Sequence, residues 1–422
     1  MWAKMLGILS MFAYLSCASN NKIIPHSIPG VVKIKKDTIF LKSGIVTISK
    51  TINIPSNTVV YGNNTTIHFS EDIVFPLINI SSASNVTFAN VTIEGSPLSM
   101  SKHTKQFLEK AERKWFLQIW NSSNINVINC KFKNSYGTTV HVSDCENMIF
   151  EKCNFKDIGL PTSTDFSYSY DAIFLGGYVL SKNITINSCQ FSNVGFTFPN
   201  QNQDNLTDGD GVHIQAAGEI EDINITNCLF ERCGARGVKI QSGKNININD
   251  NRFIDNSCSV VMAMVKTIYN INCDNNYTKN SSIVYSSETM GERIFVEGLS
   301  IKNNIVEGKC TFFLRTGGSS NIKNGIFDSN TIDDNGLFVF SGRFINSKIT
   351  NNTVKSFGSR KHSGYNMAFE IIEESDNLTI ENNKLGKFDK SNTEITNYSK
   401  NIVIFKNNTF QISKTKNSSS NQ

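Results

Sequence analysis

One short sequence frame recurs along the chain and restricts what it can fold into. The frame is an apolar residue, two variable residues, a central residue, one more residue and a second apolar residue. The central residue is cysteine or asparagine in every repeat except the first, where it is valine. Ile186 to Phe191 surrounds Cys189 in this way, and Ile248 to Phe253 surrounds Asn251. The central position recurs every 22 to 39 residues, which is typical of a solenoid of stacked coils. The twelve central residues are Val91, Cys130, Cys153, Cys189, Cys228, Asn251, Asn276, Asn304, Asn330, Asn352, Asn383 and Asn408.

Each repeat contains short stretches of alternating polar and apolar residues, such as Asn183 to Ile186, that end at Asn or Gly. Alternation of this kind indicates a β-strand, and Asn and Gly favour turns. Strands this short cannot bury their apolar side alone, but stacked coils bury it continuously. We therefore expect an all-β parallel solenoid in which equivalent asparagines hydrogen-bond from coil to coil.

Composition excludes several other classes of protein. Hydrophobic residues make up 39% and charged residues 18% of the 422 residues, which is too apolar for a disordered chain and too polar for a protein with many membrane spans. The net charge is only +5, with basic and acidic residues interspersed, so nucleic acid is not an expected partner.

The N-terminus predicts export. Lys4 precedes an apolar run from Met5 to Leu15, which is too short to span a membrane and is typical of a secretory signal. Tyr14 to Cys17 resembles the lipobox of bacterial lipoproteins, with Cys17 as the lipidated residue. The alternative is ordinary signal-peptidase cleavage nearby. We expect a secreted or envelope protein that contacts a membrane only through such an anchor.

The ten cysteines of an exported protein would ordinarily suggest disulfides. Four of them, however, occupy the same place in successive repeats, where side chains stack in a column. Buried free cysteine behaves as a small hydrophobic residue. We expect an internal ladder of reduced thiols formed by Cys130, Cys153, Cys189 and Cys228.

With these repeats, the chain resembles the right-handed parallel β-helix proteins of the pectate-lyase-like superfamily over residues 30–412. The stretches Thr38 to Gly44, Thr51 to Asn57 and Tyr61 to Asn63 are similar to the first coils of many such proteins. The resemblance implies fold more strongly than function, because the superfamily contains lyases, hydrolases, epimerases, phage tailspikes and adhesins.

The remaining segments complete the expected organisation. Residues 1–17 are the signal, 18–29 a tether, 30–412 the β-helix and 413–422 a disordered tail. Lys102 to Ile119 contains helix formers with little β-branching, and we expect a short amphipathic helix there.

Long gaps between repeats indicate excursions from the solenoid, and function in repeat folds concentrates where such insertions project. Three excursions are expected, at Pro97 to about Arg113, Leu160 to Tyr170, and Phe196 to Asp210. The strands beside them are expected to place His141, Ile173, His213 and Lys239 in one outward column, followed by Val261.

Polar residues gather at the start of these strands. Asp210 and Arg236 are 26 residues apart, as are His213 and Lys239, so the two coils should stack in register. Solvated ion pairs would be the structural alternative. Taken together, the residues suit a sugar site with paired carboxylates for catalysis and cations for a uronate. The candidate catalytic residues are Asp208, Asp210, Asp171 and His213; the candidate substrate-binding residues are Arg236, Lys239, His141, Tyr170 and Tyr168, with Tyr136 nearby.

Thr207 to His213 and Arg236 to Lys239 also loosely resemble the Asp-rich and Arg/Lys motifs of polygalacturonase-type hydrolases, although the chain has no Asp-Asp pair and no Gly-His-Gly there. This resemblance implies an acid role for Asp208 or Asp210 and substrate binding by Arg236 and Lys239.

The leading hypothesis is a glycoside hydrolase acting on an acidic polysaccharide. The alternatives are a polysaccharide lyase and a non-catalytic glycan-binding or surface protein. No metal site or cofactor is expected, except that a lyase could use Ca²⁺ held by the aspartates.

Overall fold

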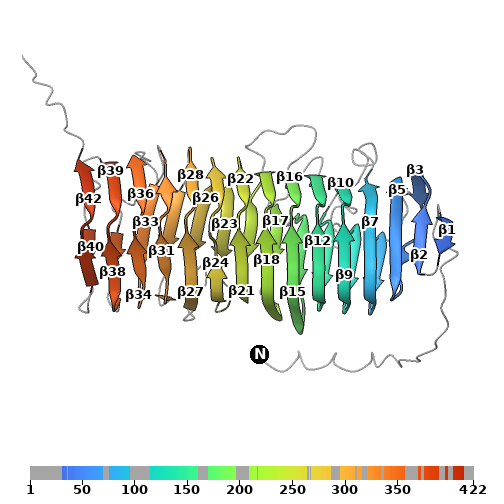
Figure 1. The fold of residues 1–422 in the computed structure, drawn as a ribbon, viewed down its shortest axis with the longest axis horizontal. Helices are drawn as coiled ribbons and strands as arrows, with labels where there is room; N and C mark the ends of the chain where they lie inside the picture. The colour runs from blue at the N-terminus through green and yellow to red at the C-terminus, as the bar shows by residue number, and fades with distance from the viewer. Residues whose placement is uncertain are drawn as a thin grey trace, which may run out of the picture.

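The computed structural model is a stack of β-coils that runs the length of the molecule, from β1 at one end to β42 at the other (Figure 1). In the described part of the chain every regular element is a strand, and no helix there is long and apolar enough to cross a membrane. The structure describes residues 31–35, 37–69, 76–95, 115–135, 137–159, 170–195, 209–215, 217–263, 266, 268–286, 295–308, 311–315, 321–333, 337–356, 369–371, 375–388, 395–397 and 403–412. The predicted signal, tether and C-terminal tail lie outside these ranges.

One sheet of 13 described strands forms one side of the solenoid, and its strands follow one another in sequence order. All its pairings are parallel, so each strand is reached after one complete coil. Its strands are β4 (Ile52–Asn53), β6 (Ile78–Ser81), β8 (Leu117–Trp120), β11 (Val140–Ser143), β14 (Ile173–Gly176), β17 (Asp210–Ile214), β20 (Arg236–Ile240), β23 (Cys258–Ala263), β26 (Ser282–Ser286), β29 (Thr311–Arg315), β33 (Leu337–Gly342), β37 (Phe369–Ile371) and β40 (Ile395–Asn397).

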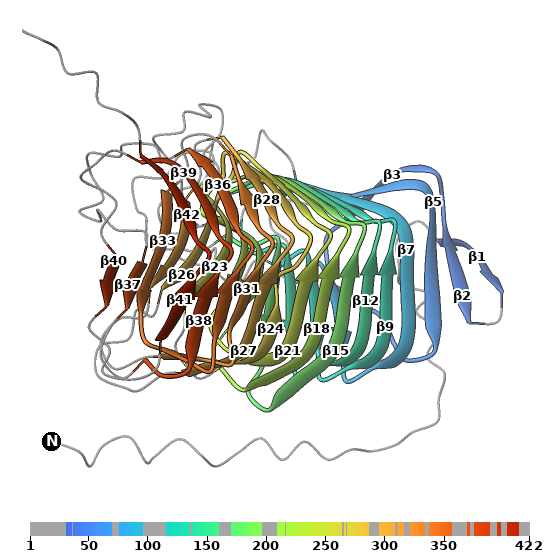
Figure 2. The ribbon, with the colours of Figure 1, turned by 60° about the vertical axis from the view of Figure 1, so that its left-hand side comes forward.

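The other 29 described strands form a second, sharply bent sheet that closes the coil (Figure 2). Its strands are β1 (Val31–Lys35), β2 (Thr38–Leu41), β3 (Gly44–Ile48), β5 (Thr58–Phe69), β7 (Ser84–Glu94), β9 (Ser123–Ile128), β10 (Lys131–Ser135), β12 (Glu146–Glu151), β13 (Asn154–Ile158), β15 (Leu180–Asn187), β16 (Gln190–Val194), β18 (Glu219–Thr226), β19 (Leu229–Cys233), β21 (Gly243–Asn249), β22 (Arg252–Ile254), β24 (Ile268–Asn272), β25 (Tyr277–Lys279), β27 (Phe295–Lys302), β28 (Ile305–Glu307), β30 (Asn321–Lys323), β31 (Ile326–Asp328), β32 (Thr331–Ile332), β34 (Phe344–Ile345), β35 (Lys348–Thr350), β36 (Thr353–Ser356), β38 (Leu378–Glu381), β39 (Lys384–Phe388), β41 (Val403–Lys406) and β42 (Thr409–Ile412).

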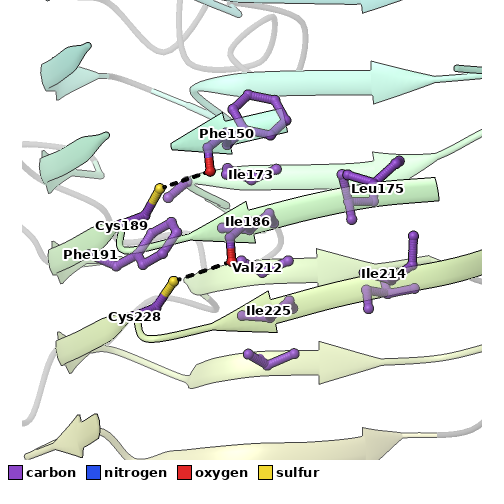
Figure 3. Packing of buried hydrophobic residues seen from close by; sticks show 14 of the residues in the cluster. Phe150, Ile173, Leu175, Ile186, Cys189, Phe191, Val212, Ile214, Ile225 and Cys228 are labelled. Carbon is purple, nitrogen blue, oxygen red and sulfur yellow. Dashed lines mark hydrogen bonds between the residues drawn. The ribbon is translucent and has the colours of Figure 1, made fainter. Parts of the chain in front are cut away.

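The predicted cysteine ladder is confirmed. Cys130, Cys153, Cys189 and Cys228 are buried, unbridged and equivalent in successive coils. Each thiol lies near backbone carbonyls, as Cys189 Sγ does at 3.6 Å from Phe150 O (Figure 3). Such contacts are weak, because sulfur is a poor hydrogen-bond donor.

The asparagines at the central position of the later repeats, which we call rungs, form a hydrogen-bonded ladder, as predicted. Asn304 Nδ2 donates to Cys273 O at 2.8 Å and to Asn330 Oδ1 at 2.9 Å. Its own Oδ1 accepts from the backbone N–H of Asn276 at 2.9 Å and from Asn276 Nδ2 at 3.1 Å. The same pattern joins every rung from Asn251 to Asn408, so these buried amides are satisfied by one another.

Phenylalanines stack beside the cysteine ladder. The rings of Phe132, Phe155, Phe191, Phe230 and Phe253 follow one another with centroids 4.6 to 5.0 Å apart and planes 3° to 9° apart. The spacing matches the ~4.8 Å between neighbouring strands, so the coil repeat itself sets this geometry.

The predicted helix is wrong where it can be checked. Its last residues form β8, which pairs in parallel with β6 and β11. Leu117 and Ile119 are fully buried and alternate with partly exposed Gln118, a period of two that fits a strand. Residues 102–114 of the predicted helix lie outside the described residues.

Candidate functional site

The candidate site lies on three successive strands, β14, β17 and β20. Asp210 pairs in register with Arg236, and His213 with Lys239, as the 26-residue spacing predicted. Asp171 is level with Asp210, because Ile173 pairs with Val212 and each aspartate lies two residues earlier. The site therefore spans three coils, with the two aspartates and Arg236 at the start of the strands and His213 and Lys239 near their ends.

The glycines of the two site motifs have a packing role. A Cβ added at Gly211 would lie 2.6 Å from a ring carbon of Phe230, and one at Gly237 would lie 2.5 Å from a ring carbon of Phe253. Only glycine leaves room for the phenylalanine stack beneath these strands. The phenylalanine stack thus sets the distance between the core and strands β17 and β20, which carry the charged side chains.

His213 lies between two partners. Its Nδ1 is 3.1 Å from Asp171 Oδ2, and its Nε2 is 3.1 Å from Gln241 Oε1. Burial by itself would lower the pKa of His213, but attraction to the Asp171 carboxylate and the hydrogen bond to it outweigh burial and raise the pKa. A protonated imidazole, which donates from both nitrogens, satisfies both acceptors.

Asp210 is the most perturbed carboxyl group of the cluster. Its side chain is fully buried, and that burial, followed by repulsion from Asp171, raises its pKa to about 7. Arg236 Nη1 at 3.4 Å from Oδ1 and Lys239 Nζ at 3.9 Å from Oδ2 oppose the rise. Oδ2 has no hydrogen-bond partner among the described residues and lies 4.0 Å from His213 Nδ1. This carboxyl can hold a proton near neutral pH.

The cations lie nearer to solvent than the carboxylates. The side chains of Arg236, Lys239 and His213 are 23%, 10% and 8% exposed, whereas those of Asp171 and Asp210 are 1% and 0% exposed. A ligand that approaches from solvent therefore meets positive charge first.

Asp171, Asp210 and His213 could also be considered as metal ligands, because their ligand atoms lie within 4.8 Å of one another. Two features make the set a poor fit to a divalent ion. Arg236 and Lys239 already lie within 4 Å of Asp210, and Ca²⁺ prefers six to eight oxygen ligands. The cluster suits a bound proton better.

The predicted outward column is partly wrong. Ile173 is fully buried and points into the core (Figure 3), and Phe174 occupies the outward position between His141 and His213. Ala172 to Leu175 are all apolar, so alternation could not identify the inward residues. Val261 follows Lys239 as predicted.

His141 is separated from the charged residues by Phe174. Its ring is stacked between Trp115, at 4.1 Å, and Phe174, at 5.2 Å between centroids. Burial lowers the pKa of His141 to about 4, so this imidazole is neutral at physiological pH. It belongs to an aromatic row beside the cluster.

Of the remaining predicted site residues, the structure describes only Tyr170. Tyr170 is almost fully buried, which does not suit a ring that stacks on a sugar from solvent. Asp208, Tyr168, Tyr136 and Cys17 lie outside the described residues. Sequence reasoning missed Gln241 and Trp115. Gln241 could have been found, because it lies two residues after Lys239 on the same outward side of the strand.

Comparisons with known proteins agree with the architecture. The family described as "Right handed beta helix region" matches residues 116–289. No curated protein sequence matches the chain. This match and the parallel coil register confirm that the chain folds as a right-handed parallel β-helix.

Solved structures show the same fold at low identity. The pre-mature gene product 12 of bacteriophage phi29 is 14% identical with a TM-score of 0.54, over 83% of this chain and 49% of that one. The tailspike protein of E. coli bacteriophage HK620, in complex with a pentasaccharide, is 13% identical with a TM-score of 0.51, over 88% and 72%. An exopolygalacturonase from Thermotoga maritima is 14% identical with a TM-score of 0.45, over 89% and 84%. At these identities the likeness to the two phage proteins concerns the fold alone.

Proposed function

We propose that this protein is a glycoside hydrolase that cleaves an acidic polysaccharide outside the cytoplasm, after export directed by its N-terminus. The observation that carries the proposal is Asp210, a fully buried carboxyl with a pKa raised to about 7 beside a second carboxyl, Asp171. Glycoside hydrolysis needs such a pair, in which one group is protonated while the other is ionised. A glycan also fits a fold on which the HK620 tailspike holds a pentasaccharide.

The raised pKa of Asp210 assigns it the role of general acid and leaves Asp171 as the second carboxyl group. Asp210 donates its proton to the leaving glycosidic oxygen, and the C–O bond breaks. Carboxyl oxygens of Asp171 and Asp210 lie within 4.8 Å of each other, a separation nearer to that of a retaining pair. Asp171 attacks the anomeric carbon as the C–O bond breaks and forms a glycosyl–enzyme ester. Asp210, now ionised, takes a proton from the water that hydrolyses this ester and releases Asp171. The hydrogen bond from His213 at 3.1 Å orients the Asp171 carboxyl group. Asp208 stays the predicted alternative acid.

The cations supply the preference for an acidic substrate. Arg236 and Lys239 are the most exposed charges of the cluster, and Arg/Lys contacts to a carboxylate are stronger than neutral hydrogen bonds. Both cations also hold down the pKa of Asp210. A uronate carboxylate that draws them away raises the pKa of Asp210 further, so substrate binding would itself favour the acid form.

The test is product formation from uronate polymers, including polygalacturonate and alginate, and from their carboxyl-reduced counterparts. We expect new reducing ends from at least one uronate polymer, no ultraviolet-absorbing products, and much less product from its neutral counterpart. Lys239→Ala should reduce this preference for the acidic polymer. Unsaturated products would identify elimination instead, with His213 or Lys239 as the base. Absence of any product together with retained binding would identify a glycan-binding protein.

A further inference from the structure

A second group of side chains lies where β8, β11 and β14 end, and β14 is the one strand that this group shares with the charged cluster. It consists of Trp120, Asp144, Tyr178 and Val179, which we name the Asp144 corner. Asp144 follows β11, and Tyr178 and Val179 occupy the turn between β14 and β15. None of these residues belongs to the charged cluster.

The Asp144 carboxylate ties the corner together. Its Oδ1 accepts the backbone N–H groups of Tyr178 and Val179, each at 2.8 Å. Its Oδ2 accepts Trp120 Nε1 at 3.3 Å and the Ser143 hydroxyl at 3.2 Å. Burial acts to raise the pKa of Asp144, but these donors, led by the two backbone N–H groups, hold the pKa below its ordinary value.

Packing against the next coils holds the turn from both sides. A Cβ added at Gly177 would lie 2.7 Å from Asp144 Oδ1, and a Cβ added at Gly218 would lie 2.6 Å from Gly177 O. Both glycines therefore allow close approach. The turn before Tyr178 is held in one position by the coil before it and the coil after it.

This fixed turn presents apolar side chains to solvent. Tyr178 is 86% exposed, Val179 73% and Trp120 45%. Exposed apolar side chains that are grouped on a fixed turn mark a candidate binding surface. Beside them lies a hollow of about 220 Å³ whose lining includes Asn121, Ser123, Asp144, Glu146, Leu180 and Lys182.

The chemistry of the corner matches a sugar ring. An aromatic face can cover the apolar C–H side of a pyranose, and amide, hydroxyl and carboxylate groups can bind its hydroxyls. Asp144 and Glu146 outnumber Lys182, whose ammonium already lies 3.1 Å from Glu146. This negative balance disfavours a uronate here, in contrast to the cationic face of the cluster.

We propose that the Asp144 corner is a binding site for a neutral sugar residue, with Tyr178 as its main contact. Sugar binding there is independent of cleavage at the cluster. If the proposed function also holds, the two sites, on neighbouring coils of the same sheet, would favour a polysaccharide that contains both acidic and neutral residues.

The test is the affinity of neutral oligosaccharides, measured by titration calorimetry and by Trp fluorescence. The probes are glucose, galactose and mannose oligomers and a carboxyl-reduced uronate oligomer. We expect at least one probe to bind the wild type, and Tyr178→Ala to weaken that binding about fivefold to tenfold, as loss of an aromatic contact does. Tyr269→Ala, at another exposed tyrosine on β24, should leave the affinity unchanged.

Lys239→Ala separates the two sites, because it should leave neutral-sugar binding intact even if cleavage of acidic polymers is lost. Absence of binding by every neutral probe, or equal affinity of Tyr178→Ala and wild type, would overturn the proposal. Self-association that Tyr178→Ala abolishes, without sugar binding, would also overturn it and identify the corner as an interface between copies of the chain.

Discussion

The coils with cysteine rungs and the coils with asparagine rungs have the same backbone fold. They differ in the interactions of their central side chains and in the residues on their outer surface. We name them the cysteine coils, from Cys130 to Cys228, and the asparagine coils, from Asn251 to Asn408. In the cysteine coils the sulfur atoms lie 3.2 to 3.6 Å from backbone carbonyls, and Cys189 Sγ accepts the Cys153 N–H at 3.4 Å. In the asparagine coils each rung from Asn251 to Asn383 joins its neighbours through amide hydrogen bonds of 2.8 to 3.2 Å.

The outer surface differs as well. The charged cluster stands on three consecutive coils, at β14, β17 and β20, above the phenylalanine stack. After Lys239 the same outward column continues with Val261. The two regions therefore differ in what stabilises them. Hydrogen-bonded asparagines stabilise the later coils, whereas stacked phenylalanine rings support the coils that carry the candidate site.

The largest expected effect concerns catalysis. Asp210→Asn removes the proton donor and should lower turnover of the acidic polymer by about 10²- to 10⁴-fold, the usual contribution of a general acid. The matched control is Asp274→Asn in the asparagine coils, where the carboxylate contacts Lys302 and the Ser300 hydroxyl. That variant should retain activity. Circular dichroism checks that both variants are folded, and full activity of a folded Asp210→Asn protein would remove this residue from the mechanism.

The next effect concerns the two ladders. Asn304→Ala removes four hydrogen bonds and leaves the Asn276 N–H and the Cys273 carbonyl unpaired inside the protein. At ~1–3 kcal/mol for each unsatisfied group, we expect a loss of about 3–5 kcal/mol in the free energy of unfolding. Cys189→Ala loses only weak contacts and a small buried volume, so about 1–2 kcal/mol is expected.

Denaturant unfolding followed by circular dichroism measures both variants under identical conditions. A similar loss for the two substitutions would contradict the distinction between the ladders. Because solenoid coils can unfold separately, the transition should also be followed by hydrogen exchange in each half of the protein.

Much of the fold could be predicted from sequence because one residue position recurs with a regular spacing. The rung at Asn304 and the pairing of Asp210 with Arg236 both follow from counting residues between equivalent positions. The predictions failed where residue spacing does not determine which side chains point inward or whether a segment is a strand. Ile173 and Phe174 lie in an unbroken apolar run, and β8 is formed by residues whose neighbours on β6 and β11 favour a strand.

The site was predicted less completely, for a physical reason. Residue types indicated carboxylates beside cations, but which of them is buried depends on packing between coils. Tyr170 could not be recognised as a buried residue from its type, and Gln241 became relevant only once its amide was seen beside His213. The Asp144 corner depends on contacts across 24 to 35 residues, which no local pattern reveals.

The pKa of Asp210 also links the site to stability. The folded-state pKa is raised above the ordinary value, so the folded protein binds this proton more tightly than the unfolded chain does. Its contribution to the free energy of unfolding is therefore fully present below about pH 4 and is lost as pH rises through about 7. The lowered pKa of His141 has the opposite effect, because it makes the free energy of unfolding rise between about pH 4 and 6.5. Comparing wild type with Asp210→Asn isolates the contribution of Asp210, because both proteins contain His141.

The most direct measurement is the titration of the Asp210 carboxyl itself, observed as the infrared difference between wild type and Asp210→Asn across pH. The account predicts a protonated carboxyl that ionises at about pH 7, and a free energy of unfolding that falls between pH 4 and 7 in the wild type relative to the variant. Ionisation near the ordinary value of 3.8, with no difference in pH dependence between the two proteins, would contradict the claim that this group is the acid of the site.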